Sequence, residues 1–415
     1  MSVLQEFHIL PNQVASMRQL GGKCGLALAV CLTIAGLSLV VFLGARVFGP
    51  PLDPGLVRAD NEFAFKLFRE VMREQGNKNV LISPVSVAIA LHMTYNGASG
   101  KTKEAMARSL GLEGMSLDEI NGANAKLTRL LATPDSGVQV DVANSLWGRR
   151  GLSFKPEFIR RALQFYNAEV SNLDFANPDA PTKINSWVAR KTGGKISEVV
   201  QSFQPDEGSV LVSAASFTGP WMNGFDESFT DRYEFHLPGG RTKYVPMIGK
   251  LGTFMFSSGV VSGKSDGPRM IRLPYSNSRM SMYIMLTGGH LDWLCQNLNP
   301  AAWDEWISRM RETDDIMLFL PCFQMKYTAD LGKALEALGV DLSQPLSVTT
   351  IRHGTFAEVA DVGAKPVEEV KPVSNGYVFM AGSPFFFAIR DDKTGVILFM
   401  GWVADPAPDR PALSR

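Results

Sequence analysis

A long polar segment between two apolar stretches, near the C-terminal end, constrains this chain most. Alternating residues up to Val359 predict one strand, and apolar residues that resume at Tyr377 predict another. Residues 364–376 between them contain two prolines and four charged residues. A connection of this length exceeds an ordinary hairpin loop and, in a compact domain, is typically functional. The sequence therefore predicts a functional loop here.

The overall composition predicts one large folded domain without a preference for polyanions. The chain has 415 residues, 45% of them hydrophobic, and 41 basic residues balance 41 acidic ones. This length allows a substantial core, whereas a net charge of zero gives no long-range attraction to nucleic acid. One local basic cluster is explained by a solvated helix end and consists of Arg149, Arg150, Lys155, Arg160 and Arg161. We expect no nucleic-acid partner.

The N-terminal region is predicted to be separate from the domain that follows. Residues 24–45 contain no charged residue, and as a helix they would cross the hydrocarbon core of a bilayer. Basic residues at Lys23 and Arg46 flank this segment, so charge only weakly favours a signal anchor with its N-terminus inside. Cleavage after Ala45 is the alternative, because small residues precede that bond.

These patterns divide the chain into five parts. We expect a cytoplasmic segment, a transmembrane signal anchor or cleaved signal, a linker, a folded domain and a tail, at residues 1–23, 24–45, 46–59, 60–406 and 407–415. In both alternatives the folded domain lies outside the cytoplasm. The protein is then either anchored to a membrane through its N-terminal segment or secreted.

The residues that commonly carry catalysis or metals show no such arrangement. Cys295 and Cys322, outside the apolar segment, lack metal-ligand spacing, and a disulfide between them is allowed but not specified. The histidines include no metal-binding pair and stand at His8, His92, His236, His290 and His353. We expect no enzyme activity, no metal and no cofactor.

Helices are predicted for most of the first part of the domain, and strands for much of the rest. Apolar residues from Glu62 to Gln75 recur at helical spacing, and a turn is expected at Gly76. A second helix is expected to start at Ser83 and Pro84, residue types favoured at a helix start. Apolar strands, several buried on both faces, are predicted at residues 136–148, 209–219, 268–287, 316–327 and 377–403.

Many residues of the domain match, in order, the pattern of one known family. The densest run of matches is Asn79, Ser83, Pro84, Ser86, Ala90, Leu91, Met93, Gly97, Ala98, Gly100 and Thr102. Later matches include Asn144, Leu146, Asn185, Trp187, Val188, Thr192, Lys195, Ile196, Val212, Phe217, Gly219, Trp221, Phe225, Val245 and Met247. With these residues the chain resembles, over most of its length, the serpins, a family of serine protease inhibitors. Residues 353–363 and 383–406 resemble the two borders of the serpin reactive loop.

This resemblance implies an α+β serpin fold, with helices around a large central mixed sheet, smaller sheets and an exposed reactive loop. In this family a serine protease attacks the loop as a substrate. The cut loop then inserts into the sheet as a new central strand and traps the acyl-enzyme in a distorted state. The implied partner is an extracellular or periplasmic serine protease, and the chain is expected to be a monomer.

The resemblance also places control of sheet opening in a polar cluster at Ser83, Ser86, Ser213 and His353. Hydroxyl and imidazole groups make few, exchangeable hydrogen bonds, which suits such control. The alternative, that each side chain caps a helix or satisfies a neighbour, stays open, above all for the two helix serines. Because Ser213 replaces the asparagine that the family favours, we expect a weaker or reorganised cluster.

The hinge at the start of the loop departs from the family pattern, which has small residues after its first glycine. This chain has Gly363, Ala364, Lys365, Pro366, Val367 and Glu368. In the family register Pro366 and Glu368 would point inward, where proline lacks the N–H of a central strand and the carboxylate has no evident partner. A penalty of about 3 kcal/mol would slow insertion about 10²-fold, so that hydrolysis of the acyl-enzyme precedes trapping.

We therefore expect a poor or non-inhibitory serpin. The alternative is a working suicide-substrate inhibitor of a chymotrypsin-like serine protease, with Tyr377 as the recognised residue. Counting from Gly363 places the scissile bond at Tyr377–Val378, next to the following strand. The loop is about four residues shorter than in a familiar inhibitor, and this shortening allows any bond from Val370 to Val378.

Overall fold

The computed structural model describes residues 52–133, 135–261, 264–265, 267–340, 342, 346–359 and 376–406. The chain divides into two compact units, Met1–Pro51 and Leu52–Arg415. The expected membrane segment at 24–45 and the hinge at 363–368 lie outside the described residues. No helix of the described part is both long and apolar enough to cross a membrane.

The described helices are amphipathic or buried, and several begin at residues suited to a helix start. They are α3 (Pro54–Gln75), α4 (Pro84–Tyr95), α5 (Gly100–Leu110), α6 (Leu117–Leu131), α7 (Pro156–Tyr166), α8 (Ala180–Lys191), α9 (Leu291–Asn297), α10 (Pro300–Ser308) and α11 (Gly332–Ala337). α3 begins at Pro54 instead of Glu62, because Asp53 Oδ1 accepts a hydrogen bond from Leu56 N–H at 2.9 Å and Pro54 occupies the first turn. Residues 54–59, expected in a linker, therefore belong to this helix.

Helix α4 is buried along its whole length. Every residue from Pro84 to Tyr95 is buried, and the helix packs against α3 and α6 and against strands of both large sheets. A helix that is apolar on all sides belongs in a core. It starts at Ser83, as predicted, but the Ser83 side chain does not cap it.

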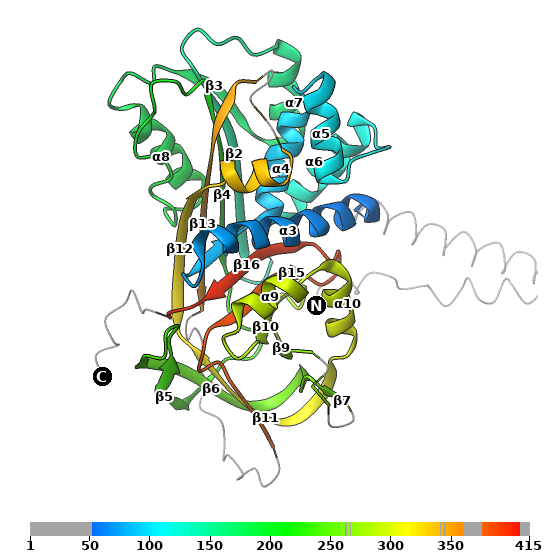
Figure 1. The fold of residues 1–415 in the computed structure, drawn as a ribbon, viewed down its shortest axis with the longest axis vertical. Coiled ribbons are helices and arrows are strands. Elements are labelled where there is room, and N and C mark those ends of the chain that lie inside the picture. The colour runs from blue at the N-terminus through cyan, green and yellow to red at the C-terminus, as the bar shows by residue number, and fades with distance from the viewer. Residues whose placement is uncertain are drawn as a thin grey trace, which may run out of the picture. The chain divides into compact units, whose positions relative to one another are not determined.

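A five-stranded sheet has the order β12 (Phe323–Asp330), β13 (Val348–Val359), β4 (Ser209–Thr218), β2 (Gln139–Arg149) and β3 (Glu169–Leu173). Its central strands β4 and β13 are parallel, from Val348 opposite Ser209 to Ala357 opposite Phe217. Their outer neighbours, β2 and β12, are antiparallel to them. We call the paired edge between β4 and β13 the seam (Figure 1).

The second large sheet has nine strands. Eight follow the order β1 (Val80–Ile82), β16 (Ile397–Val403), β15 (Phe385–Asp391), β10 (Met280–Leu286), β9 (Arg269–Pro274), β6 (Thr242–Ser257), β11 (Arg311–Pro321) and β14 (Tyr377–Met380). β5 (Asp226–His236) pairs with β6, and β7 (Val260–Val261) forms a separate hairpin with β8 (Lys264–Ser265).

Three of the predicted strand regions contain more than one strand. Residues 268–287 form β9 and β10 because Asn277 Oδ1 accepts hydrogen bonds from the N–H groups of Arg279 and Met280, which stabilises a turn. Residues 316–327 span β11 and β12, which belong to different sheets and separate at Cys322. Residues 377–403 form β14, β15 and β16.

Two hydrophobic clusters cover the seam on its opposite faces. The main core joins α3 and α4 to the nine-stranded sheet and includes Phe217 of β4 and Ala357 of β13. A second cluster lies under α8, where Trp187 and Val188 pack with Val212 of β4 and Phe356 of β13. Figure 1 shows α8 beside the five-stranded sheet. A strand placed in the seam would therefore be buried on both faces.

Candidate functional site

Three polar side chains stand on one line across the five-stranded sheet. Asn144 of β2 lies opposite Ser213 of β4, and Ser213 lies opposite His353 of β13. All three residues are buried. This line crosses the seam at its middle.

The start of α4 supplies two more members of the cluster. Ser83 N–H donates to His353 Nε2 at 3.0 Å, and Ser83 Oγ donates to the carbonyl of Leu398 at 2.8 Å. Ser86 Oγ and Ser213 Oγ are 2.8 Å apart, and Ser86 Oγ lies 3.5 Å from Asn144 Oδ1. We call Ser83, Ser86, Asn144, Ser213 and His353 the latch cluster.

His353 bridges three elements through both ring nitrogens. Because Nε2 accepts from Ser83, Nδ1 carries the proton and donates to the carbonyl of Ser213 at 3.1 Å. Burial lowers the pKa of His353 to about 4, and the hydrogen bond to Ser213 opposes this shift. The neutral imidazole thus connects β13 to the backbone of β4 and to the start of α4.

The structure brings together all four residues that the sequence places in this cluster. Ser83 does not act as a helix cap, since its hydroxyl donates to Leu398 of β16. Ser213, although shorter than asparagine, still reaches Ser86. Asn144 was matched to the family pattern but not assigned to the cluster, because its register with Ser213 is not visible in the sequence.

A second polar group joins the strands where the seam begins. Buried Glu207, just before β4, accepts from Thr350 Oγ1 at 2.6 Å and from Gln204 N–H at 2.7 Å. Arg352 of β13 lies 3.6 Å from Glu207 and 3.2 Å from Asp330 of β12. These contacts connect both sides of the seam at the end opposite the loop.

The long loop begins where β13 ends, at Val359, and ends where β14 begins, at Tyr377. The predicted hinge residues Gly363, Ala364, Lys365, Pro366, Val367 and Glu368 lie outside the described residues. Tyr377 and Val378, the expected scissile bond, belong to β14 and pair in parallel with Ile316 and Met317 of β11. Both side chains are 53% exposed, and Arg269 donates to the carbonyl of Val378.

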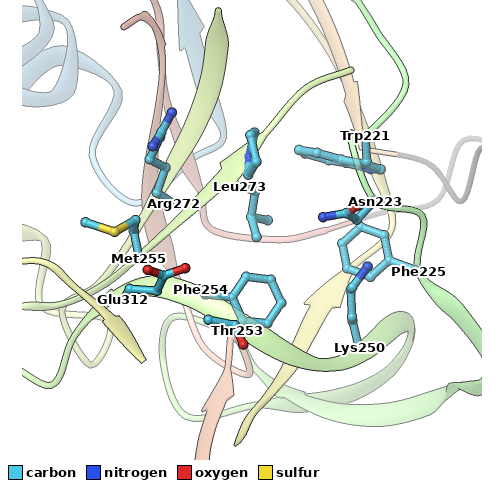
Figure 2. A pocket seen from close by; sticks show the side chains of 11 residues that line it. Trp221, Asn223, Phe225, Lys250, Thr253, Phe254, Met255, Arg272, Leu273 and Glu312 are labelled. Atoms are coloured by element: carbon cyan, nitrogen blue, oxygen red, sulfur yellow. The ribbon is translucent and has the colours of Figure 1, made fainter. Parts of the chain in front are cut away.

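A small cavity lies among β6, β9, β11 and the segment that follows β4 (Figure 2). Its walls are largely apolar and include Trp221, Phe225, Phe254 and Leu273. Its volume of about 170 Å³ is below the range of typical ligand pockets. Both cations on its wall are engaged, since Arg272 pairs with Asp392 at 2.7 Å and Lys250 donates to the carbonyl of Gly224 at 2.7 Å.

An open groove of about 440 Å³ lies between α8 and the strands β2 and β3. Its rim carries two acidic residues, Glu169 and Asp179, and two basic residues, Lys183 and Arg190. Because both signs are equally represented, the groove has no preference for a ligand of one charge.

The local basic cluster is partly neutralised by acidic neighbours. Arg160 and Arg161 both contact Glu157 at 2.7 Å, and Arg150 pairs with Asp174 at 3.2 Å. Two carboxylates therefore offset two of the five positive charges.

Two features bear on catalytic or covalent chemistry. Contrary to the expectation that no catalytic arrangement stands in the sequence, residues 263–267 have the Gly-x-Ser-x-Gly spacing of a hydrolase nucleophile, a motif that requires a turn from a strand into a helix. Ser265 lies instead in the short strand β8 of a hairpin. Cys295 and Cys322 are half-buried and are not bonded to each other, so the disulfide that the sequence allows is not formed.

These features define an α+β protein with a latched parallel seam and a long connection that follows one strand of that seam. The chain belongs to the serpin family, since residues 58–406 match the family described as Serpin (serine protease inhibitor).

Similar proteins come from distant organisms. An uncharacterized serpin-like protein of Thermococcus kodakarensis is 31% identical, over 85% of this chain and 86% of that protein. Serpin-Z7 of Hordeum vulgare is 31% identical, over 80% of this chain and 91% of that protein. The crystal structure of human thyroxine-binding globulin with its ligand has a TM-score of 0.77 and 24% identity, over 85% of this chain and 98% of that one.

Proposed function

We propose that this serpin is a poor or non-inhibitory member of its family, whose loop is cut by a serine protease without trapping it. One observation carries the proposal: the sequence has Pro366 and Glu368 in the segment that follows β13, where the family resemblance places the hinge. The fold does not decide the matter, because serpin folds serve more than one activity. Thyroxine-binding globulin, for example, was solved in complex with thyroxine.

The seam explains why these two residues oppose insertion. At the end where the loop leaves β13, Phe217 and Ala357 face the main core. Ser216 and Phe356 are buried as well. An inserted strand would thus be buried on both faces, and a carboxylate buried there without a partner is strongly disfavoured. Proline also withholds one hydrogen bond from a central strand.

The expected penalty decides whether the loop inserts before the acyl-enzyme is hydrolysed. A misplaced proline costs about 3 kcal/mol, which slows insertion about 10²-fold if the transition state carries the full penalty. Burial of Glu368 acts in the same direction. Hydrolysis of the acyl-enzyme then releases the protease before the loop inserts.

The site of cleavage is proposed to precede Tyr377. A protease binds its substrate as an extended strand, so a segment whose backbone is already paired is a poor substrate. Tyr377 and Val378 are paired with β11, which favours bonds in the part of the loop from Val370 to Gly376.

The test is the thermal stability of the full-length chain before and after a single cut in the loop. Elastase, whose small pocket accepts valine, is the first probe because Val370 and Val373 lie in the loop; chymotrypsin tests Tyr377. We expect clean cleavage, release of active protease and no rise in unfolding temperature. A large rise after cleavage, or an SDS-stable complex with the protease, would refute the proposal.

A hinge variant provides the matched comparison. Pro366→Thr combined with Glu368→Ala removes both obstacles, and we expect the cut variant to unfold at a clearly higher temperature than the cut wild type. Val367→Ala changes a neighbouring position that would point outward, and we expect it to behave like the wild type. No gain in the double variant would show that the hinge is not the obstacle.

The alternative function, a working inhibitor of a chymotrypsin-like protease, is favoured by one observation. The latch cluster and the fully paired seam, which serpin trapping requires, are intact. The same experiment separates the two functions, because a working inhibitor would form the SDS-stable complex with chymotrypsin.

We further propose that the serpin domain acts outside the cytoplasm as a monomer, either secreted or anchored through residues 24–45. The uncharged length of that segment supports this location. Alkaline carbonate extraction of membranes from expressing cells distinguishes the forms, since an anchored chain stays in the pellet. Recovery of the intact chain in the cytoplasm would contradict both.

A further inference from the structure

Two ionisable side chains face each other inside the helical part of the molecule. Asp60 of α3 is 5% exposed and His92 of α4 is fully buried. Asp60 Oδ1 lies 3.5 Å from His92 Nε2. Neither of these two atoms has a hydrogen-bond partner among the described residues. The two atoms therefore face each other, and no hydrogen bond from another described residue satisfies either one.

One neighbour of His92 bears on the direction of its ring. Asn124 Oδ1 lies 3.2 Å and Asn124 Nδ2 lies 3.1 Å from His92 Nδ1, and Nδ2 also donates to the carbonyl of Ile120 at 2.8 Å. The hydrogen bond to Asn124 raises the pKa of His92, as donation from Nδ1 to Asn124 Oδ1 does. In that arrangement the lone pair or the second proton of the ring is directed at Asp60.

Few other charges reach this pair. The ionisable group that faces it is Tyr166 of α7, whose hydroxyl donates to Asn121 Oδ1 at 2.6 Å, with Arg161 acting on Tyr166 from the same helix. Helix α6 contributes the uncharged amides of Asn121 and Asn124. Within the described part of the chain, neither Asp60 nor His92 forms an ion pair with a residue of α5, α10, α11 or the strands.

We propose that Asp60 and His92 share a single proton and thereby form a pH-dependent contact between α3 and α4, which is stable while the proton is present and weakens when it is lost in mildly alkaline solution. The contact works with the proton on either partner. A neutral carboxyl donates to a neutral imidazole, and an imidazolium donates to a carboxylate.

The number of bound protons gives the sign of the pH effect. Burial raises the pKa of Asp60 from its ordinary 3.8 to about 8. Burial lowers the pKa of His92 from its ordinary 6.5 to about 4, and the hydrogen bond to Asn124 opposes this shift. The folded pair therefore binds one proton from about pH 4 to about pH 8.

The unfolded chain binds the same number of protons over only part of this range. With ordinary pKa values, it holds one proton on these two groups between pH 3.8 and 6.5, and none above. Stability changes with pH only where the two states bind different numbers of protons. The pair thus contributes no pH dependence from about pH 4 to 6.5, and it destabilises the fold progressively from pH 6.5 to 8.

This contact bears on the serpin seam because α4 connects the two places. His92 lies in the last turn of α4, and Ser83 and Ser86 of the latch cluster lie at its start. A helix buried on all sides transmits a shift along its length, because a packed core does not deform continuously. Loss of the proton is therefore expected to loosen the latch cluster as well.

The experiment compares the full-length wild type with Asp60→Asn by thermal unfolding in a non-ionic detergent between pH 5 and 9. Asparagine preserves the shape and can donate to Nε2, but it does not ionise. We expect the wild-type midpoint to fall by about 2–4 °C between pH 6.5 and 8 relative to Asp60→Asn. Glu62→Gln makes the same carboxyl-to-amide change at the exposed salt bridge to Lys66 on α3, and its profile should follow the wild type.

Two readouts on the wild type keep the proposal testable even if Asp60→Asn fails to fold. Infrared and ring-nitrogen NMR spectra should together show one proton on the pair at pH 7. Hydrogen exchange should show that the Ser83 amide, the donor to His353, loses protection above pH 8. A wild-type fall that persists unchanged in Asp60→Asn, or a carboxylate beside a neutral imidazole at pH 7, would overturn the proposal.

Discussion

Replacement of His353 by leucine tests the central contact of the latch cluster. His353 accepts from the buried N–H of Ser83 and donates to the buried carbonyl of Ser213. Leucine removes the imidazole partner of both backbone groups, and a buried group left unsatisfied costs about 1–3 kcal/mol. We therefore expect the free energy of unfolding to fall by about 2–6 kcal/mol at pH 7.

The same substitution should also change the response to acid. The pKa of His353 is about 4 in the folded protein and 6.5 ordinarily. A lowered histidine pKa gives stability that is fully present above pH 6.5 and is lost as the pH falls towards 4. The difference of 2.5 pH units corresponds to about 3 kcal/mol. The wild type should lose this amount through His353, and the leucine variant should not.

Urea unfolding followed by tryptophan fluorescence, at pH 7.0, 5.5 and 4.5, measures both effects. His236→Leu, on the exposed face of β5, is the control and should retain the wild-type stability and acid response. The Asp60–His92 pair contributes no pH dependence from about pH 4 to 6.5, and its contribution between pH 6.5 and 7.0 is common to the wild type and both variants, so it cancels in the comparison. A loss below 1 kcal/mol at pH 7, or an undiminished acid response in His353→Leu, would refute the reasoning.

Two further substitutions test packing and charge in the nine-stranded sheet. Gly401→Ala should destabilise the protein by about 1–3 kcal/mol, because the added Cβ would lie 2.3 Å from a ring carbon of Phe387. Gly252→Ala, whose Cβ would meet nothing within 3.7 Å, should be nearly neutral in the same denaturation assay. Arg279→Met removes the guanidinium that lies 2.5 Å from the buried carboxylate of Asp391. We expect the free energy of unfolding to fall by about 3 kcal/mol, because a buried charge is left without its partner. A thermal midpoint equal to that of the wild type would contradict this.

The sequence predicts elements well where local chemistry determines them. Ser83 and Pro84 mark the start of α4, and the region 209–219 coincides closely with β4. Long strands such as β6 (Thr242–Ser257) were not predicted, because their residues are partly exposed and lack a continuous apolar run. Strand pairing over long distances, such as Val80 of β1 with Trp402 of β16, leaves no local signal.

For the site, too, the sequence indicates which residue types matter but not which residues stand opposite each other in the sheet. The family resemblance suffices to name Ser213 and His353, but only the register of the sheet shows that Asn144 stands on the same line. Asp60 was missed because the helix was predicted to begin at Glu62, which placed Asp60 just before it, where an acidic residue is ordinarily solvated. His92 offered a usable signal, since a histidine within a helix that is apolar on every side requires a buried partner.

The seam between β4 and β13 also sets the order in which the chain can complete its sheet during synthesis. Ser213 and His353 are 140 residues apart, so β4 emerges from the ribosome roughly 10 s before its partner, at ordinary rates of translation. During that interval the edge of β4 is unpaired and open to any extended segment, including one from another chain. A seam that is closed in the finished protein is therefore exposed to mispairing while the protein is being made.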